Sequence, residues 1–82
     1  MHIVEAKHIK PNPPLSNRER EVLALVANGL TNVEIGMELH ISIATVKNHR
    51  SRIIGFLGAN NMPHAVAIAI QRGELVVMRR EG

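Results

Sequence analysis

The residues best suited to chemistry lie in one stretch of the chain, and their chemistry is the donation of hydrogen bonds to an anionic partner. Residues 39–73 carry Lys47, Arg50, Arg52 and Arg72 and no acidic residue, whereas residues 1–38 hold five acidic and four basic groups. The whole chain of 82 residues has a net charge of +3. A cluster of cations in one part of a small chain is typical of a surface that faces phosphate, although a solvated basic face gives the same composition.

The spacing of these donors predicts that they share one face of a helix. At about 100° per residue, Val46, Ile53 and Leu57 form an apolar stripe. The opposite half carries four donor side chains: Lys47, Asn48, Ser51 and Arg52. Ammonium, guanidinium, amide and hydroxyl groups are those that read base edges and phosphates in a DNA major groove. Arg50 falls nearer the apolar stripe, and we expect it to pair with Glu19 or Glu21.

Capping signals and periodicity predict four helices that position this face. Capping boxes run from Ser16 to Glu19 and from Thr31 to Glu34, Ser42 is a good N-cap, and Pro63 suits a first turn. We therefore expect helices over residues 16–28, 32–39, 43–57 and 62–72, packed as a compact all-α four-helix bundle. Prolines within residues 11–14 predict an N-terminal arm or linker over residues 1–14. The helical domain then covers residues 15–75, and residues 76–82 form a C-terminal tail.

The second and third helices are joined by only a few residues, which is the arrangement of a helix-turn-helix. The connection is His40, Ile41 and Ser42. Gly36 lies inside the second helix, where glycine costs about 1 kcal/mol relative to alanine. Close approach of the third helix to that backbone would explain the glycine, and a neutral accident is the alternative.

Residues 15–75 resemble the LuxR-type (GerE-like) helix-turn-helix domain of bacterial transcription factors. The matching segments are L-S-N-R-E-R-E-V-L-A-L-V-A-N-G-L-T-N-V-E-I, I-S-I-A-T-V-K-N-H-R-S-R-I, L-G-A-N-N and A-V-A-I-A-I-Q-R-G-E-L. The resemblance implies a DNA-binding domain whose third helix enters the major groove and whose fourth helix forms a homodimer. The half-sites of such a dimer lie about 10 bp apart.

The resemblance and the geometry together assign two sets of DNA contacts. The base-facing set is Lys47, Asn48 and Ser51, to which the helical wheel adds Arg52. The phosphate-facing set is Thr45 and His49 by resemblance, together with Thr31 and Asn32, because donors at a helix N-terminus suit phosphate. A regulator of this kind is cytoplasmic and associates with the nucleoid when bound to DNA. Double-stranded DNA is its expected partner, and RNA polymerase is a further candidate.

Several positions depart from the pattern of the family. His40 stands where glycine is usual, although histidine is among the residues that tolerate a left-handed conformation. Phe56 stands where the family usually has a basic residue, and Gly55 stands where the family often has another. We therefore expect modest DNA affinity and an apolar patch around Ile54 and Phe56. Only 14 residues precede the resemblance, which indicates a stand-alone member or an excised domain.

The fourth helix is apolar on every side, which predicts a second cover besides the core. We expect Ala65, Ile68 and Ala69 to face the core. The remaining apolar positions are the expected dimer interface: Val66, Ala67 and Ile70. Small alanines let a twofold mate approach closely. The alternative is that the arm or the tail, residues 75–78, folds over this helix.

Other classes of function fit the sequence less well. A promoter-reading region of a sigma factor shares the helix-turn-helix spacing. A helix-turn-helix-fold adaptor or anti-regulator would instead bind a protein partner through Phe56 and the helix over residues 62–72. We expect no enzyme and no catalytic residues, because no nucleophile–base pair is visible. We also expect no metal site, no cofactor, no small-molecule ligand and no membrane span, since the histidines lack metal-ligand spacing and no apolar run is long enough.

Overall fold

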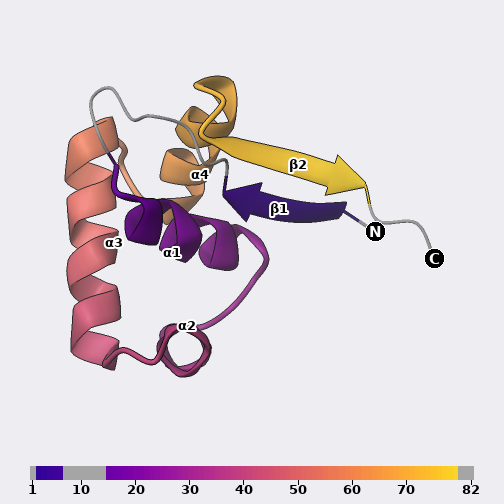
Figure 1. Cartoon of the computed structure of the whole chain (residues 1–82). Coiled ribbons are helices and arrows are strands. Elements are labelled where there is room, and N and C mark those ends of the chain that lie inside the picture. Colours follow the sequence, from indigo (N-terminus) through magenta and orange to yellow (C-terminus); the bar gives the residue numbers. More distant parts are fainter. Residues whose placement is uncertain (1, 7–14, 80–82) are drawn as a thin grey trace.

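The computed structural model describes residues 2–6 and 15–79, which form four helices and a pair of strands (Figure 1). The elements in chain order are β1 (His2–Ala6), α1 (Asn17–Ala27), α2 (Asn32–Leu39), α3 (Ile43–Leu57), α4 (Met62–Gln71) and β2 (Leu75–Arg79). The four predicted helices are confirmed, and each end lies within one residue of its expected position.

The helices begin where the capping residues predict. The backbone N–H of Glu19 donates to Ser16 Oγ, and the N–H of Ser16 donates to Glu19 Oε1, both at 3.0 Å. Thr31 and Glu34 exchange the same two hydrogen bonds at the start of α2, at 2.9 and 3.2 Å. Ser42 Oγ accepts from the N–H of Thr45, so α3 also starts with a capped turn. These bonds satisfy donors that a helix start leaves without an intrahelical partner.

The turn between α2 and α3 explains two unusual residues. His40 caps the C-terminus of α2 in the left-handed conformation, with φ of 58°. Gly36 is buried, and a Cβ atom there would lie 2.8 Å from the carbonyl oxygen of Ile41. The close neighbour of Gly36 is therefore the turn itself, rather than the body of the third helix as the sequence suggested. A side chain at this position would push the turn away and tilt α3.

The hydrophobic core lies between the helices and holds α3 in place. Its buried apolar residues come from every helix, from β2 and from the segment just before α1: Leu15, Val22, Leu23, Ala24, Ile35, Val46, Ile53, Met62, Ala65, Ala69 and Leu75. Arg20 is also fully buried, and its Nη1 donates to the carbonyl oxygen of Leu15 at 2.9 Å. This bond fixes the segment that leads into α1.

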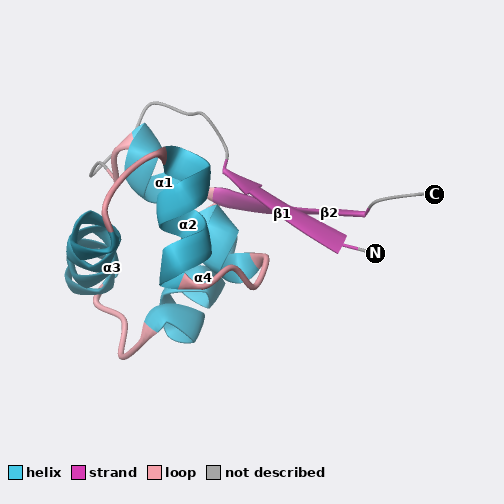
Figure 2. Ribbon diagram, turned by 90° about the horizontal axis from the view of Figure 1, so that it is seen from below, coloured by secondary structure: helices cyan, strands magenta, loops and turns pink. Residues whose placement is uncertain are grey.

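The fold is not entirely α-helical, because the segments expected to be an arm and a tail contain paired strands. β1 and β2 are antiparallel, with Val4 opposite Val77 and His2 opposite Arg79. The strands project from the helices as a ribbon, on the side away from α3 (Figures 1 and 2). A pairing between the two ends of the chain depends on long-range contacts, so the local sequence pattern did not reveal it. Residues 7–14 and 80–82 of the expected arm and tail lie outside the described residues.

Within residues 2–6 and 15–79, no single helix is long and apolar enough to cross a membrane. Together α3 and α4 reach the length and composition of a span, but they form a pair bent by 55°.

Candidate functional site

The outer face of α3 brings the three central base-facing residues of the prediction together. Lys47, Asn48 and Ser51 are all exposed, and they lie one helical turn or less apart. Ala44 and Gly55 extend the same face and are small, and no atom lies within 4 Å of the place where a Cβ of Gly55 would stand. The face is therefore a shallow ridge of hydrogen-bond donors that an approaching surface can reach without obstruction.

One flank of this ridge borders an open groove that is lined by two basic side chains. The groove has a volume of about 580 Å³ and is lined by Lys47, Arg50, Ser51 and Ile54 of α3 and by Asn60, Asn61, Met62 and Pro63. Asn61 is the N-cap of α4 and accepts from the N–H of His64 at 2.8 Å. The positive end of the α4 dipole therefore lies beside the two basic side chains. This combination makes the groove a favourable place for an anion.

Arg50 borders the outer face of α3, although its position on the helical wheel did not place it among the DNA-facing residues. It was expected to pair with Glu19 or Glu21, but Glu19 pairs with other residues and Arg50 lines the groove instead. The wheel gave its angle on α3 correctly. A helical wheel cannot show where other elements pack. In the structure, the start of α4 lies beside Arg50 and forms the other wall of the groove.

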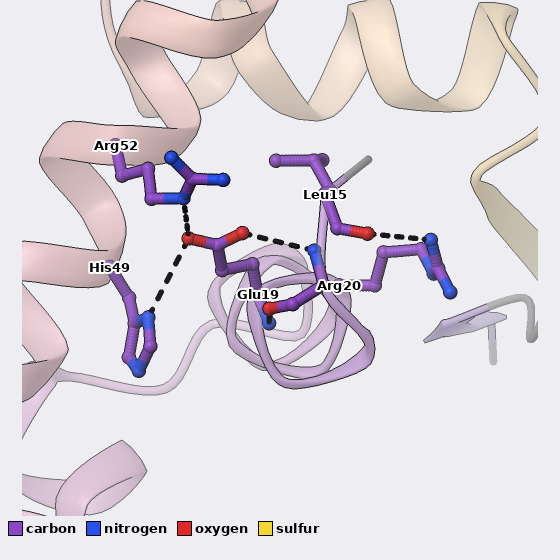
Figure 3. A network of polar contacts seen from close by, with 6 residues as sticks. Leu15, Glu19, Arg20, His49 and Arg52 are labelled. Atoms are coloured by element: carbon purple, nitrogen blue, oxygen red, sulfur yellow. Dashed lines mark hydrogen bonds and ion pairs between the residues drawn. The ribbon is translucent and has the colours of Figure 1, made fainter. Parts of the chain in front are cut away.

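The other flank of α3 is held against α1 by a buried carboxylate (Figure 3). Glu19 Oε2 lies 2.6 Å from Arg52 Nε and 3.8 Å from His49 Nδ1, while its Oε1 accepts from the N–H of Ser16. The side chain of Glu19 is only 3% exposed, and that of Arg52 is 56% exposed. One carboxylate therefore caps α1 and fixes α3 to it.

These contacts change how two predicted DNA-binding residues are presented. Arg52 faces α1, and its guanidinium also lies 5.2 Å from the centroid of the Phe56 ring. His49 is half-buried, and in Figure 3 its second ring nitrogen, Nε2, points away from Glu19. A base contact by Arg52 and a phosphate contact by His49 both remain predictions. Phe56 is only partly exposed and packs against the core, so it forms a smaller apolar patch than its sequence position suggested.

At the start of α2, Thr31 and Glu34 are engaged in capping. Thr31 is exposed, but its N–H and hydroxyl bond Glu34, and these hydrogen bonds lower the pKa of the Glu34 carboxyl below its ordinary value of 4.5. Asn32 is half-buried, and its Oδ1 has no hydrogen-bond partner among the described residues. Thr45 is half-buried, and its hydroxyl lies 2.9 Å from Ser42 Oγ. The phosphate contacts predicted for these residues remain predictions, and Thr31 would have to share its donors.

The face of α4 expected to form a dimer is partly exposed. Ala67 is exposed and Ile70 is 37% exposed, whereas Val66 is half-buried and packs against the core. β2 packs against α4, and its first residue, Leu75, is buried. The tail thus covers part of α4, and Ala67 and Ile70 are left accessible.

No group of three histidine or acidic side chains that could hold a metal ion occurs in the described part of the chain.

Comparisons with known proteins give a consistent set of relatives. The family model described as bacterial regulatory proteins, luxR family, matches residues 13–69. The chain is 44% identical over 66 residues to the transcriptional regulatory protein LiaR of Bacillus subtilis (strain 168), covering 80% of this chain and 31% of LiaR. It is 39% identical over 72 residues to the spore germination protein GerE of the same organism, covering 88% of this chain and 97% of GerE. The chain therefore spans less than a third of LiaR and nearly all of GerE.

Solved structures agree in fold. The structure of the transcription factor GerE superimposes with a TM-score of 0.72 at 35% identity, over 73% of this chain and 90% of that chain. The response regulator ChrA of a heme-sensing two-component system gives a TM-score of 0.71 at 41% identity, over 78% of this chain and 32% of ChrA.

Proposed function

Because this chain belongs to the LuxR family of bacterial regulatory proteins, we propose that it regulates transcription by binding double-stranded DNA in a sequence-specific manner, with α3 in the major groove. The observation that carries the proposal is the outer face of α3. Lys47, Asn48 and Ser51 are exposed there, and residues 39–73 contain no acidic side chain. Such donors bind base edges and phosphate oxygens, and no negative charge on α3 opposes them.

The two flanks of α3 are proposed to meet the two phosphate strands that border the groove. On one flank, Arg50 and the start of α4 attract phosphate through charge and the helix dipole. On the other flank, the proposed phosphate contacts are His49 and Thr45 of α3, together with Thr31 and Asn32 at the start of α2. Glu19 neutralises part of the charge on that second flank. We therefore expect the flank with the groove to supply most of the phosphate attraction.

A dimer through α4 completes the proposal. Ala67 and Ile70 offer an accessible apolar surface next to the partly covered Val66. A twofold contact there presents two copies of α3 to successive major grooves, about 10 bp apart. DNA bound in this way lies in the cytoplasm, and RNA polymerase is the partner that an activator would contact.

The experiment that tests this proposal separates base contacts from phosphate contacts. The protein is first incubated with sheared genomic DNA at near-physiological salt, and the retained fragments are sequenced to find an enriched inverted repeat. Fluorescence anisotropy then compares that site with a scrambled site for the variants K47A and R50A. We expect K47A to lose about 1–3 kcal/mol on the enriched site and to relax the base preference at one position. We expect R50A to weaken both sites equally and to reduce the slope of log K against log salt by about 0.9.

The matched control is R18A, which removes a cation from α1 on a side chain that is 45% exposed. If R18A weakens binding as much as K47A, the net charge and not the α3 face is responsible. If no DNA is retained at all, the proposal fails and the adaptor hypothesis takes its place. That alternative is weakened by the position of Phe56, which packs against the core beneath Arg52.

A further inference from the structure

The two outer edges of the β-ribbon are treated differently by the fold. At the edge of β1, the N–H of Val4 donates to Asn28 Oδ1 at 2.9 Å, and Asn28 Nδ2 donates to the carbonyl oxygen of Val4 at 2.7 Å. One side chain at the end of α1 thus closes that edge. In the described part of the chain, no hydrogen bond closes the outer edge of β2 in a comparable way.

The register shows which groups of β2 face that open edge. In an antiparallel pair, residues alternate between those that exchange hydrogen bonds with their partner and those whose N–H and C=O point outward. Val4 bonds Asn28 and lies opposite Val77, so this pair belongs to the second kind. The N–H and C=O of Val77 therefore point away from β1, toward the outer edge of β2.

The side chains near this edge are apolar and accessible. Val76, Val77 and Met78 are 39%, 45% and 46% exposed. Exposed edges are normally protected against pairing by lysine, proline or a bulge, and residues 75–78 contain neither lysine nor proline. An apolar edge of this kind is suited to accept another strand.

We propose that the outer edge of β2 pairs in antiparallel fashion with β2 of a second copy of this chain, with the twofold axis at Val77. In this register the outward groups of Val77 bond those of Val77 in the other copy. Val76 of each copy then lies opposite Met78 of the other copy, so this pair occurs twice by symmetry. The only charged residue of β2, Arg79, is opposite Leu75 of the second copy. The backbone positions of the two Arg79 residues are then about 13 Å apart, at about 3.3 Å per residue.

The shape of the molecule favours this occupant. The ribbon projects beyond the helices, and an antiparallel mate places the second helical body at the far end of the strand (Figures 1 and 2). α3 lies on the other side of the molecule and is left accessible to DNA. The contact uses a different surface from Ala67 and Ile70 on α4 and does not depend on DNA binding. Because the paired area is small, we expect weak association that depends on concentration.

The test uses charges that distinguish this register from general stickiness. Sedimentation velocity is measured on the full chain from about 1 μM to about 1 mM, in the wild-type background and in an I70E background that blocks α4. V76K/M78K places like charges directly opposite each other in both symmetric pairs, whereas V76K/M78E places opposite charges there. We expect V76K/M78K to raise the dissociation constant at least about tenfold, and V76K/M78E to restore most of the loss. M37K, at an exposed methionine on α2, is the control and should have no effect.

Amide exchange gives a second and independent measurement on the wild-type protein. The N–H of Val77 should exchange more slowly as concentration rises, while that of Val76, which the register directs toward β1, should be protected at every concentration. This result stands even if V76K/M78K fails to fold. The proposal is overturned if the I70E protein stays monomeric, if V76K/M78E associates no better than V76K/M78K, or if exchange at Val77 is independent of concentration. Loss of association in I70E alone would place the contact on α4 and leave the DNA-binding proposal untouched.

Discussion

The contact between Glu19 and Arg52 allows the clearest quantitative prediction from this structure. Glu19 is almost completely buried, and its Oε2 lies 2.6 Å from Arg52 Nε. A pair in contact near a protein surface has about 4 kcal/mol of direct attraction, whereas fully exposed pairs retain about 0–1 kcal/mol of net stability. Since Arg52 is 56% exposed, solvent screens much of the attraction. We therefore expect a net coupling of about 1–2 kcal/mol, between these limits.

A double-mutant cycle measures this coupling directly. E19Q keeps an oxygen that can accept from the N–H of Ser16 and removes the charge, and R52Q removes the guanidinium. Urea denaturation gives the free energy of unfolding of the wild type, both single variants and the double variant. E19Q should be destabilised by about 1–2 kcal/mol, and the loss should largely vanish when Arg52 is already replaced.

The control cycle uses Arg18 and Glu21 on the outside of α1. Their charged atoms are 4.0 Å apart, and their side chains are 45% and 40% exposed. A pair of this kind should couple by no more than about 0.5 kcal/mol. Equal coupling in the two cycles would refute the reasoning, because burial of Glu19 would then contribute nothing. Coupling below about 0.3 kcal/mol for Glu19 and Arg52, within the error of additivity, would have the same consequence.

Two further predictions concern the helices that support α3. G36A should destabilise the protein by about 1–3 kcal/mol, because its Cβ would meet the carbonyl oxygen of Ile41 at 2.8 Å, whereas G55A should stabilise it by about 0.5–1 kcal/mol because the space is open. If urea denaturation showed that G36A and G55A change the free energy of unfolding in the same direction, the turn geometry would be contradicted. The lowered pKa of Glu34 contributes stability that is present above pH 4.5 and is lost as the pH falls through the folded-state value, so E34Q should flatten the acid limb of the stability profile. An unchanged acid limb would show that the capping bonds of Thr31 do not favour the ionised carboxyl.

The helices could be predicted from the sequence because their signals are local. Ser16 with Glu19, and Thr31 with Glu34, define helix starts within four residues, and the structure contains both capping boxes. The left-handed conformation at His40 agrees with the resemblance, because the family usually has glycine at this position of the turn. The ribbon could not be predicted in this way. It joins residues near both ends of the chain, and the partner of Val77 is Val4.

The sequence predicted which side chains of α3 lie on its outer face, but not which elements pack beside them. The wheel placed Lys47, Asn48 and Ser51 on the outer face, and all three are exposed. It gave no information on which element covers each flank, and the contact with Glu19 that was expected of Arg50 is made by Arg52. The start of α4 forms a groove beside Arg50, and Glu19 of α1 reaches Arg52. A long cationic side chain pairs with the carboxylate that lies nearest to it. The position of that carboxylate depends on how the helices pack, which a helical wheel does not contain.

The contact between Arg52 and Glu19 affects how α3 could bind DNA, because the Arg52 guanidinium cannot bond a DNA phosphate without weakening its contact with Glu19. If Arg52 contacts DNA, binding must first weaken a contact that holds α3 against α1, and part of the binding energy is lost. E19Q would then bind DNA more tightly than the wild type while being less stable, and R52Q would bind more weakly. If Arg52 only positions α3, both variants should change DNA affinity in the same direction, since each releases the same contact. Measuring affinity on the proteins of the double-mutant cycle therefore decides between a DNA contact and a positioning role for Arg52.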